Sequence, residues 1–193
     1  MRILVVRTHP LADSFNAALH ERVVGALSAG GHDLDRLDLY ADGFDPRLSA
    51  AERARYHDAS HVEPDMLPYV ERLRAAQALV FVHPVWSFGV PAMLKGFFDR
   101  LLRPGVAFSI DGARVTPLLS NIRKLGVVTT YGRPRWMVFY VGDLPRRQIV
   151  RYVRWFCHRD AEVVYLAHYH MNASTPQTRA TFLARVERRM RQF

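Results

Sequence analysis

Five short apolar runs, each followed by a stretch with helical spacing, constrain the fold of this chain more than any other feature. Four of the runs are rich in β-branched and other large apolar residues, which is typical of strands in a parallel sheet covered on both faces. In the second run, aspartates interrupt the leucines, so its apolar character is weaker. The runs span residues 3–6, 34–39, 79–82, 125–128 and 163–166.

The segments between the runs have the apolar spacing of helices. Strand and helix alternate five times, which predicts a doubly wound α/β sheet with right-handed crossovers and helices on both faces. The connections 41–64 and 103–121 contain proline and glycine and are too short to be separate domains. Because 193 residues also suit one domain, we expect a single domain over residues 1–193. The expected helices cover residues 14–27, 66–77, 91–101, 146–158 and 176–191.

The composition excludes several classes of protein. Cys157 is the only cysteine, so the chain has no internal disulfide and no cysteine-based zinc or iron–sulfur site. No apolar run approaches the ~20 residues of a membrane span. The apolar stretch after Met1 is too short for a signal peptide. We therefore expect a soluble cytoplasmic protein, and a reducing compartment fits the lone thiol.

The net charge is +9, and most of it belongs to the last quarter of the chain. Residues 145–193 contain ten arginines and three acidic residues, which gives this segment a charge of +7. A basic tail can bind nucleic acid, but charge balance bears on partners rather than on fold. A solvated helix face or a site for an anionic cofactor explains the charge more simply, so no nucleic-acid partner is predicted.

In a doubly wound sheet, ligands bind beyond the carboxyl ends of the strands. The first such segment leads into a helix N-terminus, where free N–H groups and the helix dipole favour an anion. His9, Ser14 and Asn16 add side-chain donors suited to a phosphate. The alternative is a plain N-cap at Asp13 or Ser14. The sequence has no GxGxxG and no GxxxxGK[ST] motif, so neither a dinucleotide Rossmann site nor a P-loop is supported.

The second segment, residues 83–91, places aromatic side chains where the chain should face a ligand. Its prolines stiffen it, and Gly89 permits close approach of the backbone. A flat heteroaromatic ring could stack against Trp86 and Phe88 while peptide groups bond its edge. The alternative is a satellite aromatic cluster.

The third segment begins with the hydroxyl-rich turn Thr129-Thr130-Tyr131-Gly132 and continues into an aromatic loop. The alternative is a mobile surface loop, but several large exposed aromatic side chains would be costly there.

The stretch HPVWSFGVPAMLKGFFDRLL, residues 83–102, closely resembles the signature of the flavodoxin-like NAD(P)H:quinone oxidoreductases. That family includes the DT-diaphorases and the ancillary reductases of glutathione-gated potassium efflux systems. His9 with Ser14-Phe15-Asn16 resembles the family's first flavin-phosphate loop, and Thr129-Thr130 with Gly132 resembles its Thr-Thr-Gly-Gly turn. The resemblance covers most of the chain and weakens beyond that turn.

The resemblance implies a flavodoxin-like fold, with the order 2-1-3-4-5 among five parallel strands, and a tightly bound flavin. By the family pattern, His9, Ser14, Phe15 and Asn16 hold the phosphate side. FAD is the expected cofactor and FMN the alternative. The family is usually homodimeric, with each site completed by the other subunit. The residues implied to hold the isoalloxazine are Pro84, Val85, Trp86, Ser87, Phe88, Thr129, Thr130, Tyr131 and Gly132.

Several positions depart from the family pattern. Tyr131 stands where the family's turn has its first glycine. The catalytic Tyr and His of the diaphorases fall near Met137 and Asp143, and neither matches, so no acid–base relay is carried over. Trp86 also replaces a residue that often contacts the flavin edge. These departures leave the substrate range open.

The resemblance predicts a flavin-dependent oxidoreductase that passes hydride from NAD(P)H, via the flavin, to a quinone or similar small acceptor with ping-pong kinetics. Tyr131 is the candidate catalytic residue, and Arg133 or Arg135 could bind the phosphates of NAD(P)H. The alternative function is a regulatory subunit of a membrane transporter of the potassium-efflux type, with reductase activity secondary. The candidates for the acceptor pocket are Trp136, Phe139 and Tyr140.

Other chemically capable residues receive structural interpretations. His57 and His61 have the i, i+4 spacing of a metal-binding pair, but no third ligand is evident, so no metal is predicted. Cys157 is interpreted as a small core residue. His168 and His170 are expected on a solvent face at a strand end. The arginines of the last helix are expected to be solvated or to contact a dimer partner.

Overall fold

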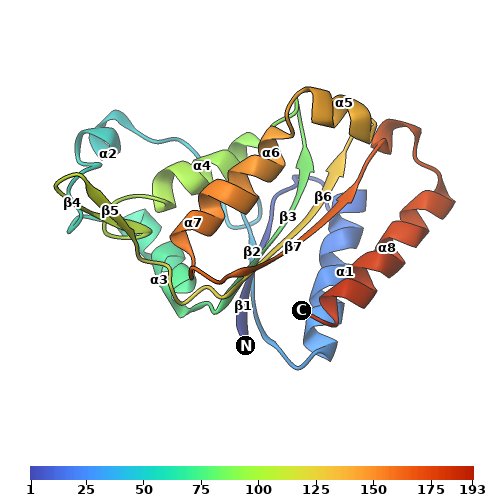
Figure 1. Cartoon of the computed structure of the whole chain (residues 1–193), viewed down its shortest axis with the longest axis horizontal. Coiled ribbons are helices and arrows are strands. Elements are labelled where there is room, and N and C mark those ends of the chain that lie inside the picture. Colours follow the sequence, from blue (N-terminus) through green and yellow to red (C-terminus); the bar gives the residue numbers. More distant parts are fainter.

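The central sheet of the computed structural model, which describes residues 1–193, has five parallel strands in the order β2-β1-β3-β6-β7 (Figure 1). This arrangement confirms the expected α/β fold, and each predicted apolar run falls within one strand or overlaps it closely. The strands are β1 (Arg2–Arg7), β2 (Asp33–Asp38), β3 (Ala78–Val85), β6 (Lys124–Tyr131) and β7 (Glu162–His168).

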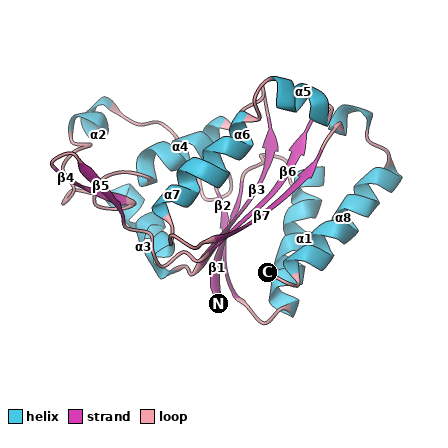
Figure 2. Cartoon of the chain, in the orientation of Figure 1, coloured by secondary structure: helices cyan, strands magenta, loops and turns pink.

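An antiparallel hairpin, β4 (Phe108–Asp111) and β5 (Arg114–Pro117), separates the third and fourth sheet strands along the chain (Figure 2). The sequence predicted only a connection over 103–121, so the hairpin adds to the prediction. Because its two strands come before the fourth sheet strand in the chain, the last two sheet strands are numbered β6 and β7. The expected order 2-1-3-4-5 becomes 2-1-3-6-7, while the five parallel strands keep the same relative arrangement.

The helices form one layer on each face of the sheet (Figure 1). Helices α1 and α8 cover one face, and α3, α4 and α7 cover the other. The expected helix 146–158 consists of α6, a π-helical stretch over Gln148–Val153, and α7. No helix reaches the length and apolar character that a membrane crossing requires. The helices are α1 (Phe15–Ala29), α2 (Ala50–Ala54), α3 (Leu67–Ala75), α4 (Ala92–Leu101), α5 (Arg135–Tyr140), α6 (Leu144–Arg147), α7 (Arg154–Phe156) and α8 (Pro176–Met190).

Alternate residues of each strand supply the two cores. In β1, Ile3 and Val5 face α1 and α8, whereas Leu4 and Val6 face the opposite layer. Full burial of such a side chain stabilises the fold by about 1.5–3 kcal/mol, so the pattern fixes the register of the strands and the position of their ends. Cys157 is buried in the core between the sheet and helices α3, α4 and α7, which agrees with its interpretation as a core residue. Burial raises the pKa of its thiol to about 12.

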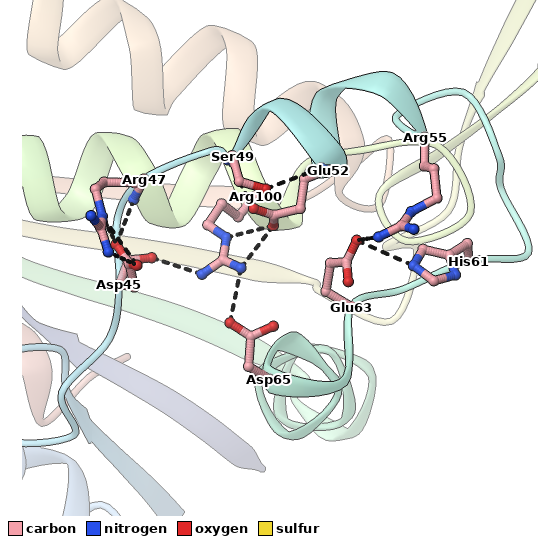
Figure 3. Close-up of polar contacts among 9 residues, drawn as sticks. All are labelled: Asp45, Arg47, Ser49, Glu52, Arg55, His61, Glu63, Asp65 and Arg100. Atoms are coloured by element: carbon pink, nitrogen blue, oxygen red, sulfur yellow. Dashed lines mark hydrogen bonds and ion pairs between the residues drawn. The ribbon is translucent and has the colours of Figure 1, made fainter.

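Arg100 is a buried residue of α4, and its side chain binds the connection that follows β2 (Figure 3). Its guanidinium donates to the Glu52 carboxylate at 2.7 Å, to Asp65 at 2.9 Å and to the backbone carbonyl of Asp45 at 2.8 Å. A cavity of about 560 Å³ adjoins this cluster. Most of its charged groups are paired with one another, as in the contact of Arg55 with Glu63, so we assign the cluster a structural role.

Candidate functional site

The loops that follow β1, β3 and β6 meet at the carboxyl edge of the sheet. In the sheet, β2 lies on one side of β1 and β3 lies on the other side. The strand order therefore reverses between β1 and β3, and the crevice there is the switch point of the sheet. The His9 ring of the first loop lies 5.7 Å from the Trp86 ring of the second loop, centroid to centroid. The structure thus brings two of the predicted segments together.

Ser14 caps α1, as the alternative interpretation of this segment expects. Its hydroxyl accepts from the backbone N–H of Ala17 at 3.1 Å and donates to the Leu11 carbonyl at 2.9 Å. In His9, Nδ1 accepts from the Leu11 N–H at 3.1 Å, and burial lowers the pKa of the ring. His9 is therefore neutral near pH 7 with its proton on Nε2, which leaves one side-chain donor for a ligand.

Asn16 is the strongest indication of a ligand-binding site in the first loop. Its side chain is 3% exposed, and neither its amide nitrogen nor its amide oxygen has a hydrogen-bond partner. A buried polar group without a partner costs about 1–3 kcal/mol. Because Asn16 lies in the first turn of α1, where free N–H groups attract anions, a phosphate would satisfy its amide nitrogen.

Three fully buried polar side chains form a row across neighbouring strands, close to the carboxyl edge of the sheet. Thr8, His83 and Thr129 lie side by side at the ends of β1, β3 and β6, and Thr8 Oγ1, His83 Nε2 and Thr129 Oγ1 lack partners. The Nδ1–H of His83 donates to the Pro84 carbonyl at 2.9 Å. Burial lowers the pKa of His83 to about 4, so the ring is neutral at pH 7.

The second loop is a tight and strained turn. The N–H of Trp86 donates to the Gly89 carbonyl at 3.1 Å, and the N–H of Gly89 donates to the Trp86 carbonyl at 2.8 Å. Between them, Ser87 and Phe88 have φ of 49° and 58°. Such a conformation costs about 1–3 kcal/mol for a residue with a side chain and clusters at ligand sites. The sequence alone does not show this strain.

A cavity of about 410 Å³ opens between the second and third loops, and we call it the flavin cavity because the sequence predicts a flavin ring there. Aromatic and apolar side chains dominate its walls and a few polar groups complete them, which is typical of a site for a flat organic ligand. The sequence had assigned six of its nine lining residues to the isoalloxazine. The lining residues are Val85, Trp86, Ser87, Phe88, Tyr131, Gly132, Arg133, Val138 and Asn172.

The prediction of a turn at residues 129–132 is wrong for the first three of these residues. Strand β6 continues through Tyr131, and Thr129 and Thr130 pair with His83 and Pro84 of β3. The parallel neighbours on both sides extend the strand beyond its apolar run. Only Gly132 remains in the turn.

Tyr131 is 1% exposed and contributes its ring to the flavin cavity. Its hydroxyl lies 2.6 Å from an Asp143 oxygen and 2.5 Å from the Tyr165 hydroxyl, and its ring stacks on Tyr169 at 4.8 Å. Because a carboxylate only accepts, Tyr131 donates to Asp143 and Tyr165 donates to Tyr131. Burial, followed by Tyr165 and Asp143, holds the pKa of Tyr131 well above its usual range.

The aromatic residues of α5 do not form a closed pocket within one chain. Trp136, Phe139 and Tyr140 are 68%, 82% and 87% exposed. Of this helix, only Val138 lines the flavin cavity. The assignment of the three residues to an acceptor pocket therefore stays a prediction that needs a further surface to cover them.

Two residues near the site were missed or misplaced from the sequence. Asn172, in the short 3-10 turn Met171–Ala173, lines the flavin cavity, and a Cβ added to Gly132 would lie 2.9 Å from its Oδ1. The expectation of a solvent face for His168 is wrong. Its ring is buried between Phe15 and Phe182, with centroids 6.0 and 5.3 Å away, because α1 and α8 meet over the end of β7.

A family model described as having the flavodoxin-like fold matches residues 1–190. NAD(P)H dehydrogenase [quinone] 1 of Rattus norvegicus is 32% identical over 147 residues, which cover 68% of this chain and 54% of that protein. The chain thus spans about half the length of this relative. The crystal structure of Smu.1420 from Streptococcus mutans UA159 is 29% identical, matches over the full length of both chains and has a TM-score of 0.90. NAD(P)H:quinone oxidoreductase from Methanothermobacter marburgensis is 27% identical, with 100% of this chain and 96% of that chain covered and a TM-score of 0.84.

Proposed function

The chain belongs to the flavodoxin-like NAD(P)H:quinone oxidoreductase family, and on that premise we propose that it is a flavin-dependent NAD(P)H oxidoreductase for quinones or similar small acceptors. The observation that carries the proposal is that an apolar cavity and an anion-suited helix N-terminus lie near each other along the carboxyl edge of the sheet. Residues 1–193 would act as one flavin-binding domain, and the buried lone thiol of Cys157 fits the proposed cytoplasmic location.

A bound flavin would supply the redox chemistry, by taking hydride from NAD(P)H and passing it to the acceptor in a ping-pong cycle. The chain's own residues bind and orient it. The Nε2–H of His9 and the amide of Asn16 are free to donate to the phosphate. Ser14 holds the helix end in place, and Phe15 packs against His168. Charge-assisted hydrogen bonds of this kind are roughly twice as strong as neutral ones.

The flavin cavity would receive the isoalloxazine. The strained turn at residues 86–89 fixes the backbone on one side, and Tyr131 and Gly132 form the other side. The ring of Trp86, which is 42% exposed, is available for stacking. The residues proposed to contact the isoalloxazine are Pro84, Val85, Trp86, Ser87, Phe88, Thr129, Thr130, Tyr131 and Gly132, of which Pro84, Thr129 and Thr130 lie in the strands and do not line the cavity itself.

We favour FAD over FMN because a further cavity adjoins the phosphate loop. This cavity, of about 360 Å³, lies between the end of β7 and α8 and includes His168, whose ring contacts Phe15 of α1. The aromatic rings and hydroxyl groups around it suit an adenosine group. Heat release of the cofactor, followed by chromatography, tests this choice directly, and elution of FMN would reject it.

A second copy of the chain would complete the acceptor pocket. The aromatic face of α5 and the exposed side chains Tyr152 and Trp155 would otherwise leave large apolar groups in water, which monomeric proteins rarely do over contiguous areas. We therefore propose a homodimer in which Trp136, Phe139 and Tyr140 become covered. Sedimentation velocity of the protein, with a Phe139→Asp variant for comparison, tests the assembly. A monomeric wild type would reject it.

The experiment that tests the proposed function is the absorption spectrum of the purified protein before and after anaerobic addition of NADH or NADPH. We expect the bands of an oxidised flavin and their loss on reduction. Asn16→Ala serves as the matched variant, because it should weaken flavin retention without removing any interaction of the free protein.

A colourless protein that also fails to bind FAD or FMN on reconstitution would contradict the proposed function. The role of an ancillary subunit of a membrane transporter would then become the leading hypothesis. Co-purification with a transporter of the potassium-efflux type would be its test.

A further inference from the structure

A second cavity adjoins the flavin cavity on the far side of Tyr131, and we call it the arginine cavity. Its volume is about 450 Å³, and residues of α5, α6, α8 and the edge strand β7 line it. Val138 lines both cavities, and the hydroxyl of Tyr131, a wall of the first cavity, reaches Asp143 in the second. The lining residues are Arg135, Val138, Phe139, Asp143, Arg146, Tyr165, Ala167, Tyr169 and Arg185.

The three arginines of this cavity come from three different helices, α5, α6 and α8, and line its walls together with Tyr169. Burial raises the pKa of Tyr169 and Asp143 raises it further, while Arg135, Arg146 and Arg185 oppose the rise. All three guanidinium groups therefore lie within electrostatic reach of Tyr169.

None of these three arginines takes part in an ion pair of the structure, whereas Arg191, directly after α8, is paired with Glu187. Arg146 instead lies over the Tyr165 ring, 5.4 Å from its centroid. Three cations held near one another with a single carboxylate among them repel, so an anionic ligand would stabilise the arrangement.

The charge of the cavity indicates which anion fits. Asp143 is its one carboxylate, and it is engaged by the Tyr131 hydroxyl. Three guanidinium groups and one carboxylate give a net charge of +2, which matches a phosphomonoester at about −1.5 to −2 near pH 7. Arginine is suited to such a group because its planar fork binds two phosphate oxygens at once. The aromatic walls suit an attached purine.

We propose that the arginine cavity binds the 2′-phosphate of NADPH and makes the protein prefer NADPH to NADH. This inference rests on the proposed function, because the nicotinamide must reach the flavin cavity for hydride transfer. The rest of the dinucleotide must then extend out of the flavin cavity. The arginine cavity is directly adjacent, because Val138 lines both cavities and Tyr131 lies between them. NADH lacks the phosphomonoester and would leave the arginines unmatched.

The first test compares the two nucleotides kinetically. We expect Arg146→Gln and Arg135→Gln to raise the KM for NADPH about tenfold relative to the KM for NADH, since each removes a charge-assisted contact with the phosphate. Arg146→Lys should recover part of the loss, because it keeps the charge without the fork. Arg188→Gln is the control, since it removes an exposed arginine of α8 that does not line the arginine cavity, and it should leave both KM values unchanged.

The second test does not depend on turnover. Calorimetry should show that adenosine 2′,5′-bisphosphate binds the wild type roughly tenfold more tightly than adenosine 5′-monophosphate, and that Arg146→Gln removes the difference. Equal binding of the two probes, or equal KM shifts for NADPH and NADH, would overturn the proposal, because the arginines would then act on groups that both nucleotides share. A protein without flavin would refute the proposed function, yet the calorimetric comparison would still decide whether the phosphate site exists.

Discussion

His83 should make the stability of the protein depend on pH in a way that one substitution removes. The side chain is fully buried, its Nδ1–H donates to the Pro84 carbonyl, and its Nε2 has no partner. No acidic group compensates a proton there, so burial lowers the pKa of His83 from 6.5 to about 4. The native state therefore keeps His83 neutral at pH values where the unfolded chain already protonates it.

The sign and the magnitude follow from this difference in pKa. Between pH 6.5 and 4 the unfolded state binds more protons, so the free energy of unfolding falls as the pH falls. The contribution of His83 is fully present above pH 6.5, about 2 kcal/mol of it is lost by pH 5, and about 3 kcal/mol is lost near pH 4, at about 1.4 kcal/mol per pKa unit. Burial also lowers the pKa of His20 and His168, which adds to the trend in the same direction.

The assay is urea unfolding at pH 7.5 and pH 5 for the wild type and for His83→Asn, whose amide can still donate to the Pro84 carbonyl but does not titrate. The wild type should lose about 2 kcal/mol more than the variant between the two pH values. NMR titration of the His83 ring in the wild type is the independent readout. A ring pKa near 6.5, or the same pH dependence in both proteins, would refute the reasoning.

Three further predictions concern other parts of the structure. Arg100→Met leaves the Glu52 carboxylate buried without its cation and should cost about 3–5 kcal/mol in urea unfolding; a loss below 1 kcal/mol would contradict the assigned role of the cluster. Asn16→Ala should weaken flavin binding about tenfold or more, measured by fluorescence titration, while the flavin-free protein keeps its stability, because the amide has no internal partner. Tyr131→Phe loses the hydrogen bond to Asp143 and should destabilise the protein by about 1–3 kcal/mol. Its turnover should stay within about tenfold of wild type, whereas a loss of 10²-fold or more would make Tyr131 a proton donor.

The sheet could be predicted from the sequence because helices cover both of its faces and bury its strands. Runs such as 79–82 are apolar on both faces, and only a parallel sheet covered on both sides buries them. The hairpin β4–β5 carries no such run, since most of its side chains are partly or fully exposed. Gly112, the first residue of its two-residue loop with a φ of 56°, is the local signal that could have predicted it.

The candidate site was predictable where it depends on one loop and unpredictable where it depends on distant contacts. Ser14 caps its own helix, and the turn at residues 86–89 is closed by its own backbone, so local sequence locates both. His168 ends β7 and Asn172 lies in the 3-10 turn that follows it, and the two residues take their positions from α1, α8 and the third loop. Nothing in their own neighbourhood along the sequence reports those contacts.

Tyr131 shows how one substitution couples these two kinds of information. A glycine at this position would leave no ring between the flavin cavity and the arginine cavity, and no hydroxyl for Asp143. With tyrosine there, the ring stacks on Tyr169 and the hydroxyl links Asp143 to Tyr165, so a single side chain forms the partition between the two cavities. The flavin loops can then keep the pattern of the family while the far side of the partition changes. The residues that distinguish one nucleotide or acceptor from another should therefore be found beyond Tyr131, on α5, α6 and the end of β7, rather than in the loops proposed to hold the flavin.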